Sequence, residues 1–246
     1  MLPLQIREIA LACKGEAHGE AQVTSVCIDS RKITPGCLFI AIKGDRFDGH
    51  DFVEKAFAQG AAAVMVHRDM PCGGPSVRVA DTREALLRLA GYYRQFFQIP
   101  VVGLTGSVGK TTTKEMTAAV LSKRYKTLKN EGNLNNEIGM PMTAFGLDLS
   151  YGAAVFEMGM SGFGEIARMA RAAAPTVGII TNIGVSHMEQ LGSRENIRKA
   201  KLELLDGMDE YAPLILNGDD GKLRRLTARS PSRSTMAMAA SASRCP

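Results

Sequence analysis

The sequence predicts an α/β protein in which a mostly parallel β-sheet, covered by helices on both faces, follows a smaller α/β unit. Short apolar segments typical of buried strands alternate with amphipathic helical segments, which is the pattern of such sheets. Hydrophobic residues make up 45% of the 246 residues and charged residues 22%, so the chain can bury a core. Near the middle of the chain, a Gly-rich turn joins an apolar strand directly to a helix.

Residues 1–80 predict the smaller unit. The apolar spacing over 4–13 predicts a helix, and the turn signal TPG at 34–36 separates two strands. Asp51 and Gly60 are typical of the start and the end of a further helix. The expected elements are helix 4–13, strands 23–30 and 37–44, helix 51–60, and strands 62–67 and 77–80.

Residues 81–225 continue as strand–helix pairs and predict the larger unit. The expected elements are helix 82–97, strand 101–105, helix 110–124, strand 153–158, helix 164–174, strand 176–181, helix 194–208 and strand 213–217. From 226 to 246 the chain is mostly Ser, Arg, Ala and Met without a strand or turn pattern. This composition predicts a disordered tail or an aberrant, frame-shifted one.

The net charge of +5 does not favour a nucleic-acid partner. Five of the 30 Lys and Arg residues lie in 223–246, which has no Asp or Glu, so 25 basic and 25 acidic residues remain in 1–222. The excess basic charge therefore belongs to the tail and not to the folded body.

Membrane insertion and secretion are not predicted either. No uncharged apolar run approaches the ~18 residues of a membrane span. Arg7 and Glu8 come too early for a secretory signal. The five Cys include no C-x-x-C pair, which fits reduced thiols in the cytoplasm better than disulfides or a zinc site.

The strongest chemical signal is the segment GSVGKTT, which follows the apolar strand VVGLT. Unpaired N–H groups around Ser107 and Val108, together with the helix N-terminus, would form a cradle for a polyphosphate. Lys110 would reach the terminal phosphates and the Thr111 hydroxyl would hold Mg²⁺. The P-loop pattern G-x-x-x-x-G-K-[ST] has Gly where this chain has Leu104, so the match is to a shortened variant. The alternative is a structural Gly turn that opens a helix.

Other polar residues fall where a parallel sheet gathers a site. Thr105, Glu157 and Asn182 lie at or just past the carboxyl ends of expected strands, the edge at which ligands bind in open α/β sheets. The Glu157 carboxylate could hold Mg²⁺ there; the alternative is a solvated acid at a strand end. His187 lies in a loop, where a single His is usually not a ligand.

Lys201 lies on the apolar stripe of the helix expected at 194–208, with Ile197, Ala200 and Leu204. An inward-facing lysine is desolvated, which lowers its pKa and favours the neutral amine. Such an amine can act as a base or be covalently modified. The alternative is a lysine whose head group reaches water.

Several separated motifs resemble the Mur ligases, the ATP-dependent amide-forming enzymes of peptidoglycan synthesis. The resemblance covers about residues 1–222, and in 29–52 it is to the family's UDP-binding domain. Within the family, NLNNEIG favours the addition of D-alanyl-D-alanine to UDP-N-acetylmuramoyl-tripeptide. The motifs are TGSVGKTTTKEM (105–116), NEGNLNNEIGMPMT (130–143), FEMGMSGFGEI (156–166), TNIGVSHMEQLGS (181–193) and KAKLELL (199–205).

The resemblance implies a reaction in two steps, with ATP and Mg²⁺ as cofactors. ATP first phosphorylates a substrate carboxylate, and an amine then attacks the acyl phosphate. Lys110 and the loop would stabilise the transferring phosphoryl group.

Thr111 and Glu157 match positions that serve a first Mg²⁺. His187 and Lys201, the latter as a carbamate, match those of a second metal. The implied catalytic residues are Lys110, Glu157, His187 and Lys201. The implied ATP-binding residues are Gly106, Ser107, Val108, Gly109, Lys110, Thr111 and Thr112.

The resemblance also implies the substrates and where they bind. The partners would be UDP-MurNAc-tripeptide and D-Ala-D-Ala, taken by a cytoplasmic monomer with no nucleic acid and no membrane insertion. For 48–50, an ordinary polar turn is the alternative. The implied substrate-binding residues are Ser30, Arg31, Lys43, Gly44, Asp48, His50, Asn135 and Asn136.

Three parts are therefore expected: a UDP-sugar-substrate-binding domain (1–80), an incomplete ATP-binding central domain (81–225) and the tail (226–246). The family has a further C-terminal domain, and the resemblance fades after 217–224. A sheet that ends there should leave an unpaired edge and exposed apolar surface. We expect this chain alone to bind nucleotide weakly and to ligate poorly or not at all.

Other interpretations stay open. A related ligase that adds diaminopimelate or lysine would be separated by a panel of substrates. A regulatory P-loop switch would carry a guanine motif such as N-K-x-D, and the sequence has none. A non-catalytic fragment that binds nucleotide or UDP-sugar would bind the UDP-sugar peptide without phosphoryl transfer.

Overall fold

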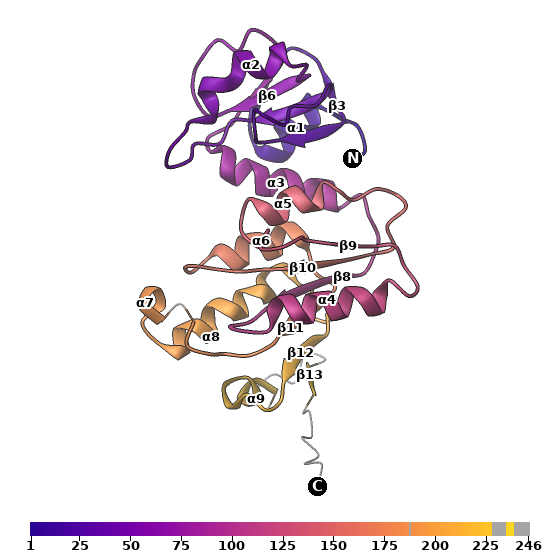
Figure 1. The fold of residues 1–246 in the computed structure, drawn as a ribbon, viewed down its shortest axis with the longest axis vertical. Helices are drawn as coiled ribbons and strands as arrows, with labels where there is room; N and C mark the ends of the chain where they lie inside the picture. The colour runs from indigo at the N-terminus through magenta and orange to yellow at the C-terminus, as the bar shows by residue number, and fades with distance from the viewer. Residues whose placement is uncertain (187, 228–234, 239–246) are drawn as a thin grey trace. The chain divides into compact units, whose positions relative to one another are not determined.

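The computed structural model describes residues 1–186, 188–227 and 235–238, which form two compact units (Figure 1). The first unit comprises Met1–Phe96 and Ala144–Asp148, and the second comprises Phe97–Thr143 and Leu149–Pro246.

Helix α3 (Thr82–Arg94) is part of the first unit, whereas the sequence analysis expected this unit to end at residue 80. The Thr82 hydroxyl donates to the carbonyl of Ala41 at 2.8 Å, and the Cys13 thiol donates to that of Ala85 at 3.4 Å. The helix was predicted from its own periodicity, which does not reveal the unit against which it packs.

The first unit is built on a five-stranded sheet in the order β2-β7-β6-β5-β4. The pairs within it are parallel except β2 with β7. Every residue of β5 and β6 is buried, as expected for central strands. The strands are β2 (Glu16–His18), β4 (Ser25–Cys27), β5 (Cys37–Ile40), β6 (Ala63–Val66) and β7 (Ser76–Arg78); β1 (Leu4–Gln5) pairs separately with β3 (Gln22–Val23). The helices before α3 are α1 (Ile6–Cys13), the 3₁₀ helix η1 (Gly49–Phe52) and α2 (Val53–Ala58).

The second unit is built on a parallel sheet in the order β13-β12-β11-β8-β10-β9. The strands are β8 (Val101–Thr105), β9 (Thr127–Lys129), β10 (Ala153–Glu157), β11 (Val177–Ile180), β12 (Leu214–Asn217) and β13 (Thr235–Met238). The helices are α4 (Lys110–Leu121), α5 (Gly139–Ala144), α6 (Glu165–Ala173), α7 (Met188–Leu191), α8 (Arg194–Leu202), the 3₁₀ helix η2 (Glu203–Gly207) and α9 (Gly221–Thr227).

Helices cover both faces of this sheet. On one face, Ala118 of α4 packs in a cluster with Val102 of β8 and Val155 of β10. On the other face, a Cβ at Gly103 would lie 2.9 Å from a methyl group of Leu204 in η2, so this strand position leaves room only for hydrogen. The predicted α/β architecture with a parallel sheet buried on both faces is confirmed.

Long periodic segments are predicted better than short ones. The strand expected at 101–105 is β8, and the helix expected at 194–208 is formed by α8 and η2. The sequence analysis missed short elements, which carry too few residues to show a period. They are β1, whose residues were expected to begin a helix, β2, β9, α5, α7 and α9; of β3, only Val23 was expected to be in a strand.

Strand β13 was not expected, because no structure was predicted for 226–246; α9 also extends two residues into this range, to Thr227. It pairs in parallel with β12, from Leu214 opposite Thr235 to Asn217 opposite Met238. The edge of β12, which was expected to be unpaired, is thus covered by a strand from the same chain. The remainder of the predicted disordered tail, 228–234 and 239–246, lies outside the described residues.

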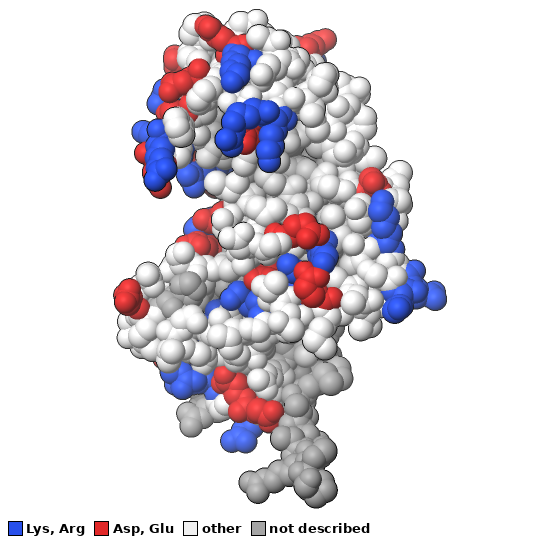
Figure 2. Space-filling view, in the orientation of Figure 1, with Lys and Arg blue, Asp and Glu red and all other residues white. Residues whose placement is uncertain are grey.

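Two further observations concern the helices and the surface. Among the described residues, none of the helices has the length and apolar character needed to cross a membrane. On the face shown in Figure 2, basic and acidic side chains are interspersed over the described part of the surface.

Asp81 caps α3, because its carboxylate accepts the N–H groups of Arg83 at 2.7 Å and Glu84 at 3.1 Å. We expect Asp81→Ala to lower the free energy of unfolding of the first unit by about 1 kcal/mol, since both N–H groups lose this acceptor. Asp81→Asn keeps an oxygen acceptor and should lose less than half as much. Urea denaturation followed by circular dichroism measures both, and equal losses would contradict this account of the cap.

Candidate functional site

The Gly-rich loop joins the carboxyl end of β8 to the start of α4. Gly106 follows the strand, and a Cβ there would lie 1.8 Å from Thr181 Oγ1, so only glycine fits. Gly109 has a φ of 78°, which glycine adopts without strain, and is the residue before the first turn of α4. Both glycines are thus explained by close approach or by backbone conformation.

Asn182, just past β11, holds the outer part of this loop. Its Oδ1 accepts the N–H of Ser107 at 3.1 Å and that of Val108 at 3.0 Å. Its main-chain carbonyl also accepts from Ser107 at 3.1 Å, and Thr181 Oγ1 donates to the Val108 carbonyl at 2.7 Å. The Ser107 hydroxyl accepts the N–H of Gly184 at 2.8 Å. The loop is therefore fixed by the end of the neighbouring strand.

These contacts correct one expectation. The N–H groups of Ser107 and Val108 were expected to be unpaired, but both are bonded to Asn182. In the described part of the loop, the N–H group of Gly106 has no hydrogen-bond partner. The N–H groups at 109–112, which open α4, have none either. They point along the helix axis beyond its N-terminus, where a helix attracts anions. Of the residues predicted to bind ATP, those at 109–112 therefore keep N–H groups free to donate to an anion, whereas Ser107 and Val108 do not.

Lys110 and Thr111 are the first residues of α4. The Lys110 ammonium donates to the carbonyl of Gly106 at 3.0 Å, so it folds back over the loop. The Thr111 hydroxyl donates to Oε2 of Glu157, at the end of β10, at 3.0 Å. Thr112 is exposed on the same turn. The structure thus brings together Thr111 and Glu157, which are far apart in the sequence and were predicted to share a metal.

Glu157 is 1% exposed, and it is held from several sides. Asn135 Nδ2 donates to its Oε1 at 2.8 Å, so the Asn-rich segment lies beside it. The buried side chain of Asn130 accepts the Glu157 N–H at 2.9 Å and donates to the Glu157 carbonyl at 3.0 Å. Asn136 turns elsewhere, since its Oδ1 accepts the N–H groups at the start of α5.

The oxygens of Thr111 and Glu157 fit a divalent cation of the Mg²⁺ type. A hydroxyl and a carboxylate are hard oxygen ligands, and Mg²⁺ commonly takes one or two protein oxygens, phosphates and water. Among the residues that the structure describes, no group of three or more His, Cys, Asp or Glu side chains could hold a metal. The donor set therefore suits a cation that shares its coordination with a phosphate. His187, predicted to serve a second metal, lies outside the described residues.

Lys201 is buried in α8, with 2% of its surface exposed. Burial, with a smaller contribution from the charge of Lys110, lowers the pKa of Lys201 from 10.5 to about 7. A substantial fraction of the side chain is therefore a neutral amine near neutral pH. This agrees with the inward position predicted from the apolar stripe.

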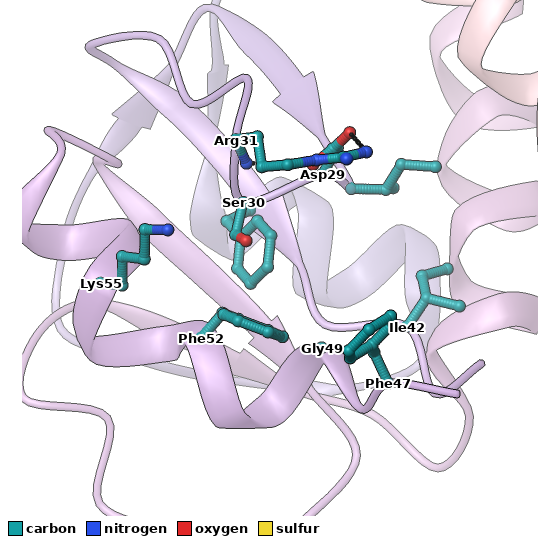
Figure 3. A pocket seen from close by; sticks show the side chains of 10 residues that line it. Asp29, Ser30, Arg31, Ile42, Phe47, Gly49, Phe52 and Lys55 are labelled. Carbon is teal, nitrogen blue, oxygen red and sulfur yellow. Dashed lines mark hydrogen bonds and ion pairs between the residues drawn. The ribbon is translucent and has the colours of Figure 1, made fainter. Parts of the chain in front are cut away.

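The first unit has a separate cavity of about 580 Å³ (Figure 3). Ser30 and Arg31, both predicted to bind substrate, line it, with Lys55 of α2 across from them. Arg31 bonds to Asp29 at 2.8 Å, which holds the pKa of that carboxyl well below its usual range. The other lining residues are mostly apolar; the set is completed by Ile28, Phe39, Ile42, Phe47, Gly49 and Phe52.

The remaining predicted substrate residues of this unit build the turn beside the cavity. The main chains of Lys43 and Asp48 form a β-bridge, and the Gly44 N–H donates to the carbonyl of Phe47 at 2.9 Å. Asp48 Oδ1 lies 2.6 Å from Nδ1 of His50, a ring that is 2% exposed. His50 Nε2 accepts the N–H of His67 at 3.1 Å. These four predicted residues do not line the cavity; the turn instead presents Phe47 to it.

Several residues of these sites were not predicted, and three of them matter most. Phe47 and Lys55 line the cavity, and Asn130 fixes Glu157. Asn130 is the first residue of the motif NEGNLNNEIGMPMT. Because asparagine side chains are mostly exposed, the residue type did not predict a buried position. The charged Lys55 lies on the predicted helix 51–60, where a solvent-facing position is the ordinary expectation.

Comparisons with known proteins agree with this division. The family described as "Mur ligase middle domain" matches residues 104–244, which include the Gly-rich loop and Glu157. The family described as "Mur ligase family, catalytic domain" matches residues 22–94, which include the cavity of the first unit.

Two curated relatives carry the name UDP-N-acetylmuramoyl-tripeptide--D-alanyl-D-alanine ligase. The protein of Bacillus subtilis (strain 168) is 44% identical over 231 residues, covering 91% of this chain and 50% of the relative. That of Escherichia coli (strain K12) is 42% identical over 221 residues, covering 89% and 49%. The chain therefore spans about half the length of the curated relatives it matches.

Solved structures are similar over the same extent. A crystal structure of MurF from Acinetobacter baumannii has a TM-score of 0.89 at 34% identity and covers 96% of this chain and 53% of that one. The MurF ligase of Thermotoga maritima, in complex with ADP, has a TM-score of 0.81 at 34% identity, covering 87% and 50%.

Because the pKa of Lys201 is lowered, the unfolded chain binds one more proton than the folded chain between pH 7 and 10.5. Stability should therefore rise with pH across this window through Lys201. We expect Lys201→Met, which removes the proton site, to be more stable than the natural chain at pH 6.5 by on the order of a few kcal/mol. The difference should shrink towards pH 10. Urea denaturation at several pH values measures it, and a difference that does not change with pH would contradict the assignment.

Proposed function

Because the chain belongs to the Mur ligase family, we propose that it forms the substrate- and ATP-binding parts of a cytoplasmic ligase that adds D-alanyl-D-alanine to UDP-N-acetylmuramoyl-tripeptide. The first unit would bind the UDP-sugar substrate and the second would bind ATP. The observation that carries the proposal is the phosphate loop at the start of α4, with the Thr111 hydroxyl 3.0 Å from the buried Glu157 carboxylate. The names and identities of the relatives support the choice of D-alanyl-D-alanine.

In the proposed reaction, the second unit binds the phosphates of ATP. The unpartnered N–H groups at 109–112 would donate to phosphate oxygens at the helix N-terminus. The Lys110 ammonium, which now bonds a loop carbonyl, would turn to the γ-phosphoryl group as this moves to the substrate carboxylate. The contacts of Asn182 keep the loop in one conformation, so little ordering is needed on binding.

Thr111 and Glu157 would hold Mg²⁺ with the phosphates, and Mg²⁺, when bound, neutralises phosphate charge. We assign Lys201 and His187 to a second cation, as the resemblance implies. The neutral amine of Lys201 would first attack CO₂, forming an N–C bond and releasing a proton. The resulting carbamate is an anion with two oxygens, which suits a cation better than the buried ammonium does.

The cavity of the first unit has the composition needed for a uridine diphosphate. Its phenylalanines offer flat apolar surfaces for the base, and Lys55 and Arg31 offer positive charge for the diphosphate. Asn135, in the second unit, already bonds Glu157, so we assign it to the neighbourhood of the reacting groups. Asn136 is assigned to positioning α5 through its Oδ1.

The ATP-binding role can be tested by titrating the chain with MgADP and MgATP in a calorimeter. We expect Lys110→Ala to weaken binding at least tenfold, because it removes the cation at the phosphates. The matched control is Lys123→Ala, an exposed lysine just past the other end of α4, which should bind as the natural chain does. A natural chain that is folded and does not bind either nucleotide at millimolar concentration would refute the ATP-binding role.

The substrate-binding role of the first unit can be tested separately with UDP. We expect Lys55→Ala to weaken UDP binding about fivefold or more, because Lys55 lines the cavity. Lys32→Ala is the control, since Lys32 is exposed and does not line the cavity. If both variants bind UDP equally well, the cavity is not the uridine diphosphate site.

A further inference from the structure

Lys114 is a fully buried cation to which the proposed reaction gives no role. It lies on α4, three residues after Thr111 and therefore on the same side of the helix, and 0% of its surface is exposed. Burying an ammonium group is costly unless it is paired, so its partners indicate what it does.

The partners of Lys114 link it to Glu157. Its ammonium donates to the carbonyl of Asn130 at 2.7 Å and lies 3.3 Å from Oε1 of Glu115. It is 3.9 Å from Oε2 of Glu157, the oxygen that also accepts the Thr111 hydroxyl. Glu115 is half-exposed and forms a further ion pair with Lys129. One cation therefore remains for Glu157, and the cluster of two lysines and two glutamates carries no net charge.

This arrangement changes how the site meets a divalent cation. The carboxylate assigned to the proposed metal position is that of Glu157, and its charge is offset by an ammonium group before any metal arrives. Two opposite unit charges about 4 Å apart interact strongly when both are out of water. A free divalent cation would thus meet one compensated carboxylate and a hydroxyl, too little negative charge for tight binding.

We propose that Lys114 suppresses binding of the free divalent cation, so that the site takes Mg²⁺ together with the nucleotide phosphates. The phosphates supply the negative charge that Lys114 cancels on the protein. Lys114 is thus a positioning residue that acts through Glu157 and sets the order of binding. This inference rests on the proposed ATP-binding function.

A purely structural role for Lys114, bonding the Asn130 carbonyl, is the alternative. Lys114→Gln separates the two roles, because glutamine keeps an N–H donor for that carbonyl and removes the charge. Glu115→Gln is the matched control: it removes a neighbouring charge of opposite sign and leaves Lys114 in place.

The probe is Mn²⁺ alone, titrated into the 246-residue chain without nucleotide and followed by the electron paramagnetic resonance signal of free Mn²⁺. We expect Lys114→Gln to bind Mn²⁺ at least tenfold more tightly than the natural chain, and Glu115→Gln to bind it no more tightly. The gain should disappear in Lys114→Gln combined with Glu157→Gln. A Lys114→Gln variant within threefold of the natural chain would overturn the inference.

The natural chain supplies a second measurement that needs no variant. Its affinity for Mn²⁺ should be at least tenfold higher with saturating ADP than without it, after correction for the Mn²⁺ that the same ADP binds in a titration without protein. Equal affinities would overturn the inference even if Lys114→Gln does not fold. If ADP does not bind at all, the proposed function fails, whereas ADP binding with no effect of Lys114→Gln defeats the role of Lys114 alone.

Discussion

In the second unit, the arrangement of α4 and of the segment after β9 depends on the buried carboxylate of Glu157. An acid with 1% exposure at the end of a central strand needs hydrogen bonds or opposite charge to be tolerated there. Thr111 provides a bond from α4, and Asn135 provides one from the segment after β9. Lys114 adds a charge from α4. Satisfying this one group therefore fixes the start of a helix and the loop beside it in a single arrangement.

The phosphate loop is held in the same way from the other side. Asn182, after β11, accepts hydrogen bonds from the N–H groups of Ser107 and Val108, and Gly106 packs directly against Thr181. The first N–H groups of α4 are left to face outward. The residues that fix the loop are thus different from those that could bind an anion. Because β11 lies beside β8 in the sheet, the residues after β11 can bond Ser107 and Val108 and leave the start of α4 free.

The sequence predicts the longer strands, the main helices and the Gly-rich loop because each is encoded locally, by periodicity or by short-range glycine spacing. The inward position of Lys201 also follows from local spacing. It does not predict that the N–H groups of Ser107 and Val108 are paired, since their partner Asn182 is remote in the sequence.

Asn130 and Lys114 escape prediction for a related reason. Burial of a polar side chain depends on a partner brought close by the fold, and residue type favours the surface for both. The contacts within the turn at 43–50 also could not be predicted from residue type. Its polar residues match substrate-binding positions of the family, but in the structure they bond one another and support Phe47 at the cavity.

The strand order of the second sheet has a consequence for how the chain is made. β8 lies between β11 and β10, both of which come later in the sequence, after β9. During synthesis, β8 leaves the ribosome with both edges unpaired and an apolar surface that only later segments can cover. The loop that follows it acquires its fixed conformation after β11 has docked. A nascent chain is thus exposed to misassociation during this interval, and the nucleotide proposed as its ligand could stabilise only the finished sheet.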